Sequence, residues 1–287
     1  MAGPAAWAGG VMPDFWSLGL ALVLTAAMVG AATLRCRGDE CSWRWWGKTA
    51  WLLGWVALII ALVSPLDALG TNGLLSGHVA QHMVLGDIAA PLLLIGLPSA
   101  LALRARRGCA ALAERHTLAA FVLSPIGAVV VWAAVTCVWV TPPVHRLASP
   151  PGAVHAIDHV SFLMLGLLVW LAAFDFRTAK PVADWDDLKR AAWTCDLPWW
   201  ARHVYAMVSR LAVIPAVTIL WLAPTAEFYL SDEALPGGWS QSVDQTNAAS
   251  MMLGFEILLA AFAVVLALIW VSVSEGRARD RAKDSSQ

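Results

Sequence analysis

Long apolar runs alternate with short polar stretches along the whole chain, and this pattern predicts the architecture. A helix that spans a membrane needs about 20 predominantly apolar residues. Seven segments come close to that length. They are Phe15–Leu34, Thr49–Ser64, Leu74–Gly96, Leu118–Val140, Val154–Phe174, Val204–Ala223 and Thr246–Val273. The sequence therefore predicts an all-α membrane protein, a bundle of about seven transmembrane helices.

Basic residues are concentrated in alternate loops between these segments, which predicts the orientation of the chain. Almost all Lys and Arg residues outside the apolar segments lie in four regions. These are the loops after the first, third and fifth segments and the tail after the seventh. The other loops hold Arg146 and several carboxylates. Because Lys and Arg are retained on the cytoplasmic side, we expect the N-terminus outside and the C-terminus in the cytoplasm. Odd-numbered segments then begin at the outer surface.

This arrangement divides the chain into three regions. Residues 1–14 form a short extracytoplasmic N-terminus, residues 15–273 form the seven-helix transmembrane domain, and residues 274–287 form a charged cytoplasmic tail. The first apolar segment is not typical of a signal peptide, because no Lys or Arg precedes it and Arg35 and Arg37 follow it.

The composition excludes an ordinary soluble domain. Apolar residues make up 59% of the chain and charged residues 14%, against about 45–50% and about 25% in soluble globular domains. Many of the 17 tryptophans lie near the predicted segment ends, where their amphipathic rings favour the headgroup region. The lipid bilayer is therefore the expected environment, and a net charge of −1 gives no reason to expect a nucleic-acid partner.

Polar side chains inside the apolar segments are costly in a membrane, so they are candidates for function. They gather near the predicted outer ends of the third, fifth and seventh segments. The side chains concerned are His78 and His82 in the third, His155, Asp158 and His159 in the fifth, and Asp244, Gln245, Met251 and Met252 at the start of the seventh. The three groups are therefore expected at one depth and on one side of the membrane.

The spacing of the histidines indicates a metal site. Residues four apart lie on one helix face, about 6 Å apart along the axis, so two H-x-x-x-H pairs can offer four imidazoles to one ion. Imidazole suits copper, zinc, iron and nickel, and methionine thioethers favour Cu(I). The candidate ligands are His78, His82, His155 and His159, with Met83, Met251 and Met252. Candidates to orient these ligands by hydrogen bonds are Asp158, Asp244, Gln245 and Asp87.

Structural roles stay open for several of these residues. A histidine pair in a membrane helix can serve interhelical hydrogen bonding, and Met side chains are more often packing groups than ligands. Asp87 is either a hydrogen-bonding group of the bundle or a proton-accessible group, and Glu256 is expected to pair internally. The histidines expected in loops or at the interface, without a metal role, are His116, His145 and His203.

The same residues resemble a known family. The stretch 78-HVAQHM-83 followed by 89-AAPLLLIGLP-98 resembles the signature of the seven-helix, CtaG-type cytochrome c oxidase assembly factors. The stretch 155-HAIDH-159, and Asp244-Gln245 with Met252 further along, resemble its second and third motifs, in family order. The resemblance implies an assembly factor rather than an enzyme. It also implies a multi-pass protein of the bacterial plasma membrane with a copper site facing the periplasm or cell exterior. Its partners would be cytochrome c oxidase subunits or other copper proteins.

Other classes fit the histidines less well. Di-iron membrane oxidases usually add an H-x-x-H-H box, which is absent, and a zinc protease needs Glu where this chain has Val79. A retinal protein needs a lysine in the seventh segment, which has none. A bis-histidine haem protein, a metal-free assembly partner, and a proton or solute transporter using Asp87 and Glu256 stay open.

Overall fold

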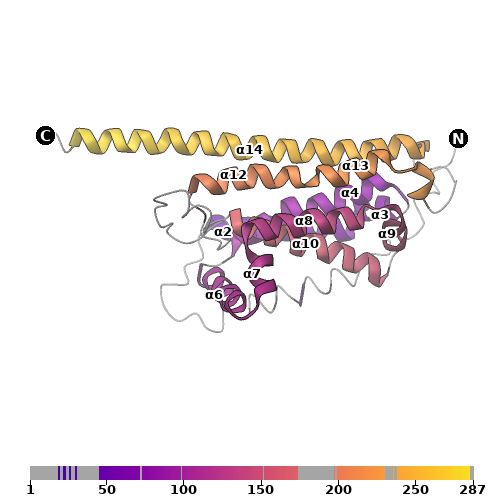
Figure 1. The fold of residues 1–287 in the computed structure, drawn as a ribbon, viewed down its shortest axis with the longest axis horizontal. Coiled ribbons are helices and arrows are strands. Elements are labelled where there is room, and N and C mark those ends of the chain that lie inside the picture. Colours follow the sequence, from indigo (N-terminus) through magenta and orange to yellow (C-terminus); the bar gives the residue numbers. More distant parts are fainter. Residues whose placement is uncertain are drawn as a thin grey trace.

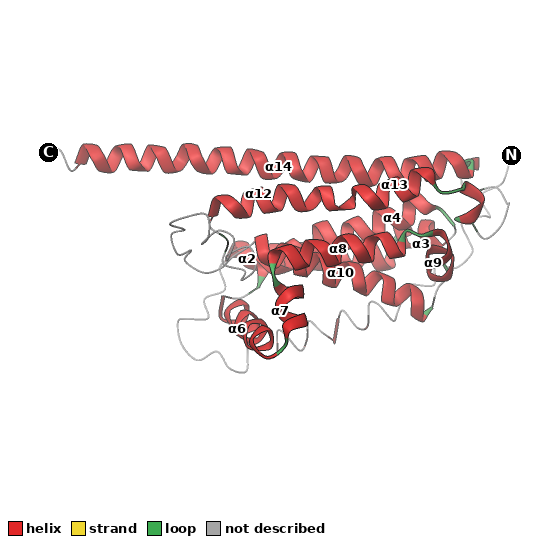
Figure 2. Ribbon diagram, in the orientation of Figure 1, coloured by secondary structure: helices red, strands yellow, loops and turns green. Residues whose placement is uncertain are grey.

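The computed structural model describes residues 45–71, 73–97, 99–150, 152–173, 199–229 and 238–284, with a few single positions elsewhere. Every regular element in these ranges is a helix and none is a strand, which confirms the predicted all-α class (Figure 2). The first predicted span, Phe15–Leu34, and residues 1–14 lie almost entirely outside the described residues.

Five helical segments of the described chain are long and apolar enough to cross a membrane, or six if one bent pair counts as a single span. They are α2 with α3 (Trp45–Val63, Pro65–Thr71), α4 with the π-helix η3 and α5 (Leu75–Met83, Val84–Ala89, Ala90–Gly96), α10 (Ala153–Ala173), α12 with η4 and α13 (Trp199–Arg210, Leu211–Val213, Ile214–Leu222), and α14 (Gln241–Asp284). The bent pair is α7 and α8 (Thr117–Leu123, Pro125–Trp139). The predicted segments from the second to the seventh therefore correspond to helices of the structure.

The fourth predicted span is not one straight helix. Its two parts, α7 and α8, meet at an angle of 84°. Pro125 lacks an N–H, and a residue before proline avoids the α conformation, so Ser124 is extended (φ −73°, ψ 152°). The Ser124 hydroxyl accepts a hydrogen bond from the backbone N–H of Gly127 at 3.0 Å. The sequence Ser-Pro thus ends one helix and caps the next.

The remaining short helices lie outside the candidate spans. They are α6 (Ser99–Arg115), α9 (Pro142–Ala148) and η5 (Thr225–Glu227). In Figure 1, α14 runs along one side of the bundle beside α12 and α13, while α6 and α7 lie on the opposite side. Helices α3 and α9 lie at the end of the bundle where α4, α10 and α14 begin. We refer to this end as the histidine end, because α4 and α10 carry His78 and His155 there.

Close helix contacts fix how α4, its π-helix and α10 sit together. A Cβ atom on Gly166 of α10 would lie 2.4 Å from the carbonyl oxygen of Gly86 in η3. Two glycines therefore allow the backbones to touch, as small residues do in membrane bundles. On the same surfaces Trp132 of α8 and Phe162 of α10 are 2% exposed and pack edge to face. This packing determines which residues of α4 and α10 face each other.

Candidate metal centre

The structure brings the four histidines of the two H-x-x-x-H pairs into one buried cluster. Their exposed fractions are 2% for His78, 7% for His82, and 1% each for His155 and His159. Ring centroids lie 4.4 Å apart within the α4 pair and 4.2 Å apart within the α10 pair. Between the helices, the ring of His78 lies 5.3 Å from that of His155 and 5.5 Å from that of His159. The matched depth expected from the sequence is therefore present.

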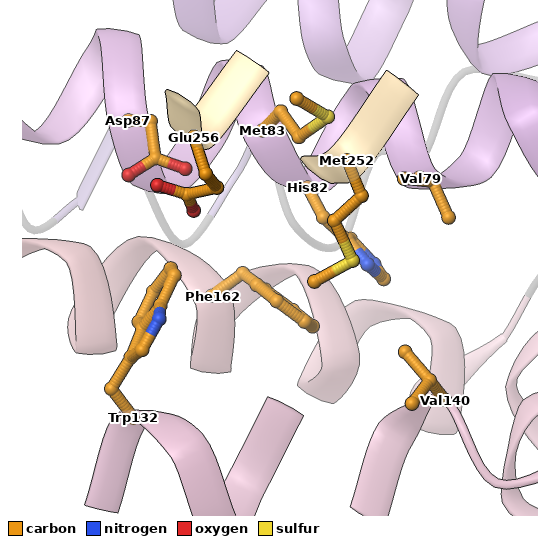
Figure 3. A pocket seen from close by; sticks show the side chains of 9 residues that line it. All are labelled: Val79, His82, Met83, Asp87, Trp132, Val140, Phe162, Met252 and Glu256. Atoms are coloured by element: carbon orange, nitrogen blue, oxygen red, sulfur yellow. The ribbon is translucent and has the colours of Figure 1, made fainter. Parts of the chain in front are cut away.

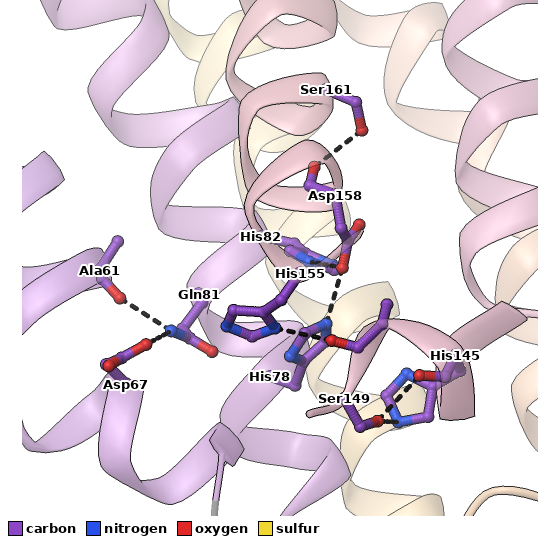
Figure 4. A network of polar contacts seen from close by, with 11 residues as sticks. Ala61, Asp67, His78, Gln81, His82, His145, Ser149, His155, Asp158 and Ser161 are labelled. Atoms are coloured by element: carbon purple, nitrogen blue, oxygen red, sulfur yellow. Dashed lines mark hydrogen bonds and ion pairs between the residues drawn. The ribbon is translucent and has the colours of Figure 1, made fainter. Parts of the chain in front are cut away.

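Asp158 joins the two helices and sets the tautomers of the α4 histidines (Figure 4). Its Oδ2 lies 2.9 Å from His78 Nε2 and 3.0 Å from His82 Nε2. An ionised carboxylate only accepts hydrogen bonds, so both Nε2 atoms carry a proton. In this arrangement a neutral imidazole keeps its lone pair on Nδ1. His78 Nδ1 is buried and has no hydrogen-bond partner among the described residues, so it is available to a ligand inside the cluster. The predicted orienting role of Asp158 agrees with these contacts.

A backbone carbonyl does the same for His155 of the α10 pair. His155 Nδ1 donates to the carbonyl oxygen of Ala148 at 2.8 Å, which leaves the lone pair on Nε2. Ligand nitrogens of His78, His155 and His159 lie within 4.8 Å of one another, a spacing that a metal ion can bridge. His78, His82 and Asp158 form a second such group, but there Asp158 Oδ2 is already hydrogen-bonded to both Nε2 atoms. The three-imidazole group is therefore the better metal candidate.

His82 is held beside this group rather than at its centre. Its ring stacks on Phe162 with centroids 3.8 Å apart and an interplanar angle of 12°. It also lies 5.5 Å from the ring of His159. His82 is therefore placed as a fourth imidazole at the inner side of the cluster.

Met83 and Met252 belong to this inner side, whereas Met251 does not. Met83 and Met252 line a small cavity of about 20 Å³ that His82 also lines (Figure 3). A cavity of this size holds a single water molecule. Met251 lines a separate surface groove with Trp239. Met251, also predicted as a ligand, thus lines a different pocket from Met252, because neighbouring residues of a helix point in directions about 100° apart.

Asp244 and Gln245, predicted to orient ligands, form hydrogen bonds that join helices. The Asp244 carboxylate accepts from the backbone N–H groups of Leu75 at 2.7 Å and Ser76 at 3.2 Å, and from Tyr229 Oη at 3.0 Å. These two N–H groups begin α4, where a helix lacks internal partners and favours negative charge. The amide of Gln245 donates to two carbonyls at the end of α13, at 2.6 and 2.9 Å. Both residues thus fix α14 against neighbouring helices.

Asp87 is also not a partner of the histidines. It pairs with Arg210 of α12, whose Nη1 lies 3.3 Å from Glu256 Oε2 of α14. All three side chains are at most 5% exposed. The guanidinium lies 4.8 Å from the ring centroid of Trp170, close enough for a cation–π interaction. The internal pairing expected for Glu256 is confirmed, and Asp87 belongs to the same charged triad.

Arg210 is a buried polar residue of the bundle that the distribution of basic residues among the loops does not reveal. Its signal is present in the chain, since it is the only Lys or Arg in the sixth apolar segment, Val204–Ala223. A charge at that depth is retained only with a partner. The triad contains two carboxylates and one guanidinium, so electrical neutrality in an apolar bundle requires one carboxyl group to hold a proton.

His145 was expected in a loop or at the membrane interface, but the structure buries it against the histidine cluster. It lies on α9, is 8% exposed, and its ring centroid is 5.2 Å from that of His78. Burial, with the neighbouring His78, lowers the pKa of His145 to about 3, so its ring is neutral at physiological pH. The available signal was its position in a loop on the same predicted side as the two histidine pairs.

Comparisons with known proteins point to one family. The family model described as cytochrome c oxidase caa3 assembly factor matches residues 23–273. No curated protein and no solved structure matches the chain. The matched range contains the histidine cluster, the charged triad and every candidate span of the described residues.

Proposed function

Because the chain belongs to the cytochrome c oxidase caa3 assembly factor family, we propose that it binds copper at the histidine cluster for delivery to the oxidase. The observation that best supports this proposal is that two H-x-x-x-H pairs meet in one buried cluster, where hydrogen bonds set the tautomers of His78, His82 and His155. A metal ion needs deprotonated nitrogen lone pairs, and the hydrogen bonds of His78 and His155 leave one on each ring.

In this proposal His78, His155 and His159 are the principal ligands, and His82 is a fourth. Asp158 and the Ala148 carbonyl orient the rings from behind, as carboxylates and carbonyls do around metal-bound histidines. Met83 and Met252 stand next to His82 as soft donors on the inner side. The cargo is copper, and no reaction is catalysed.

Charge balance supports Cu(I) over a divalent ion. The neutral imidazoles contribute no charge, and Asp158 contributes one negative charge at 1% exposure. One Cu(I) ion would make the cluster neutral, whereas Cu(II) or Zn(II) would leave a positive charge in a buried site. An uncompensated buried charge costs several kcal/mol in a low-dielectric interior, so the site should prefer the monovalent ion.

The orientation predicted by the basic residues places this site on the outer side. With seven spans and an external N-terminus, α4 and α10 begin at the outer face of the bacterial plasma membrane. The histidine end would then face the periplasm or cell exterior. Copper would pass from there to an oxidase subunit or another copper protein.

A metal-free assembly role is the second candidate. The hydrogen bonds of Asp158 to His78 and His82 would by themselves form a helix-joining network. A bis-histidine haem is less compatible, because rings of α4 and α10 pack 5.3–5.5 Å apart with no room for a porphyrin between them. A di-iron redox site also lacks support, because the described residues place one carboxylate, that of Asp158, within the cluster.

The test is metal analysis of the protein purified in detergent under reducing and oxidising conditions. A variant with His78, His82, His155 and His159 all changed to alanine is compared with His116→Ala, which alters an exposed histidine. We expect about one copper per chain in the wild type and in His116→Ala. The copper should be lost in the four-histidine variant while its circular dichroism stays helical. Equal copper in all three proteins would refute the site, and a folded wild type that takes up no copper would favour the metal-free role.

A further inference from the structure

We infer that His145 is the entry ligand of the histidine cluster, the imidazole that receives Cu(I) from outside and passes it to His78. This inference rests on the proposed function and adds the route by which the ion reaches and leaves the buried site.

The ligands themselves are closed to an ion arriving from the aqueous side. His78, His155 and His159 are each at most 2% exposed. A copper ion, or a protein that carries one, therefore cannot reach these nitrogens unless a covering element moves. At the histidine end, α9 is such an element, because it contributes both His145 and the carbonyl bonded to His155.

Helix α9 has one face buried against the cluster and one face exposed, as expected of an element that covers a site and can move away from it. Pro142, His145 and Ala148 are buried and recur every three residues along the helix. On its other face Leu147 is 64% exposed, and Arg146 is also exposed. Outward movement of α9 would carry the His145 ring toward solvent, and it would also break the hydrogen bond between Ala148 and His155. Access to the site is thus linked to the orientation of one ligand.

His145 lies where a transfer ligand is needed. Its ring packs edge to face on His78, at 5.2 Å and 81°, and Figure 4 shows it on the side of His78 away from Asp158. Ser149 Oγ donates to the His145 carbonyl at 2.8 Å and lies 3.2 Å from His145 Nε2. Because the single hydroxyl proton is used on the carbonyl, Nε2 donates to Ser149, and the lone pair of His145 is on Nδ1. The ring thus has its Nδ1 lone pair next to His78, but His145 lies outside the group of three histidines whose nitrogens can hold one ion together.

The test compares His145→Leu with His145→Met in the full-length protein in detergent. Both replacements are apolar and similar in size, so a packing role treats them alike, whereas only methionine keeps a donor atom for Cu(I). His116→Leu is the control for an exposed histidine. Cu(I) loading from a chromophoric chelator and release to a second chelator are followed by stopped flow, and equilibrium affinity is measured by competition.

We expect His145→Leu to load and release Cu(I) about tenfold more slowly, equivalent to about 1.4 kcal/mol in the barrier. Its affinity and stoichiometry should match the wild type, since an entry ligand changes both rates equally. His145→Met should recover most of the rate. Wild-type rates in His145→Leu, equal slowing in both variants, or a lower affinity in His145→Leu would each overturn the inference while leaving the copper site intact. A wild type that binds no Cu(I) would instead overturn the proposed function and this inference with it.

Discussion

At the scale of single residues, Asp158 connects α10 to both histidines of α4. One carboxylate oxygen accepts from both α4 imidazoles at 2.9 and 3.0 Å. It thereby selects the tautomer that keeps the lone pair of each ring on Nδ1, and in the proposed copper site it would supply the single negative charge that balances Cu(I). Both effects depend on an ionised carboxylate and not on the size of the side chain.

Asp158→Asn should therefore weaken copper binding while preserving the fold. The amide has nearly the same shape, but it is neutral and no longer requires a proton on both Nε2 atoms. We expect Cu(I) affinity to fall about 10- to 100-fold, as for other groups that orient metal ligands. Competition titration with a Cu(I) chelator measures this, and unchanged affinity would show that Asp158 serves only helix packing.

At the scale of elements, the charged triad joins three helical segments that are far apart in sequence. Asp87 lies on the π-helix η3, Arg210 at the end of α12 and Glu256 in α14. Single π-helical turns inside α-helices often occur at functional sites. Here the π-helix places Asp87 within reach of the arginine, and the triad ties α14 to the helix that carries His78.

Replacing Arg210 should destabilise the protein much more than replacing Glu256. Arg210→Met leaves two buried carboxyl groups without a cation, and breaking a buried pair this way costs about 3–5 kcal/mol. Glu256→Gln leaves Arg210 paired with Asp87 and should change stability by less than about 1 kcal/mol. Thermal unfolding in detergent compares the two variants. Similar melting temperatures would contradict the pairing.

The close contact between α10 and η3 should not tolerate a larger side chain at Gly166. Gly166→Ala places a Cβ atom 2.4 Å from the Gly86 carbonyl oxygen, so the helices must separate. We expect a loss of about 1–3 kcal/mol, with weaker copper binding because the α10 histidines move relative to α4. Gly254→Ala is the matched control, since a Cβ atom there meets nothing within 4 Å. Equal stability and copper affinity of both variants would refute this role of the contact.

At the scale of the whole molecule, the histidine end carries both the cluster and helix α9 with His145, while α14 continues past the apolar span to Asp284 (Figure 1). The family match makes the oxidase the expected partner. Delivery from the outer side requires that this end face away from the cytoplasm, which the distribution of basic residues predicts.

Accessibility labelling tests that orientation. In a cysteine-free background, Leu147→Cys on the exposed face of α9 should react with a membrane-impermeant maleimide in intact cells. Arg277→Cys should react only after the membrane is opened. An epitope tag at the N-terminus should be reached from outside, since an odd number of spans puts the termini on opposite sides. Labelling in the reverse order would place the histidines on the cytoplasmic side.

The sequence by itself determined the helical spans from the second to the seventh, the depth of the histidine pairs and the carboxylate between them. These are local properties, because apolar length and four-residue spacing act within one helix. Tertiary structure alone decided that Met252 and not Met251 lines a cavity with His82, that Asp244 caps α4, that Arg210 pairs with Asp87, and that His145 packs against His78. Each of these depends on how a helix is rotated about its axis against segments distant in sequence. That rotation is set by packing between helices, such as the contact of Gly166 with Gly86. It cannot be predicted from the sequence pattern of one segment alone.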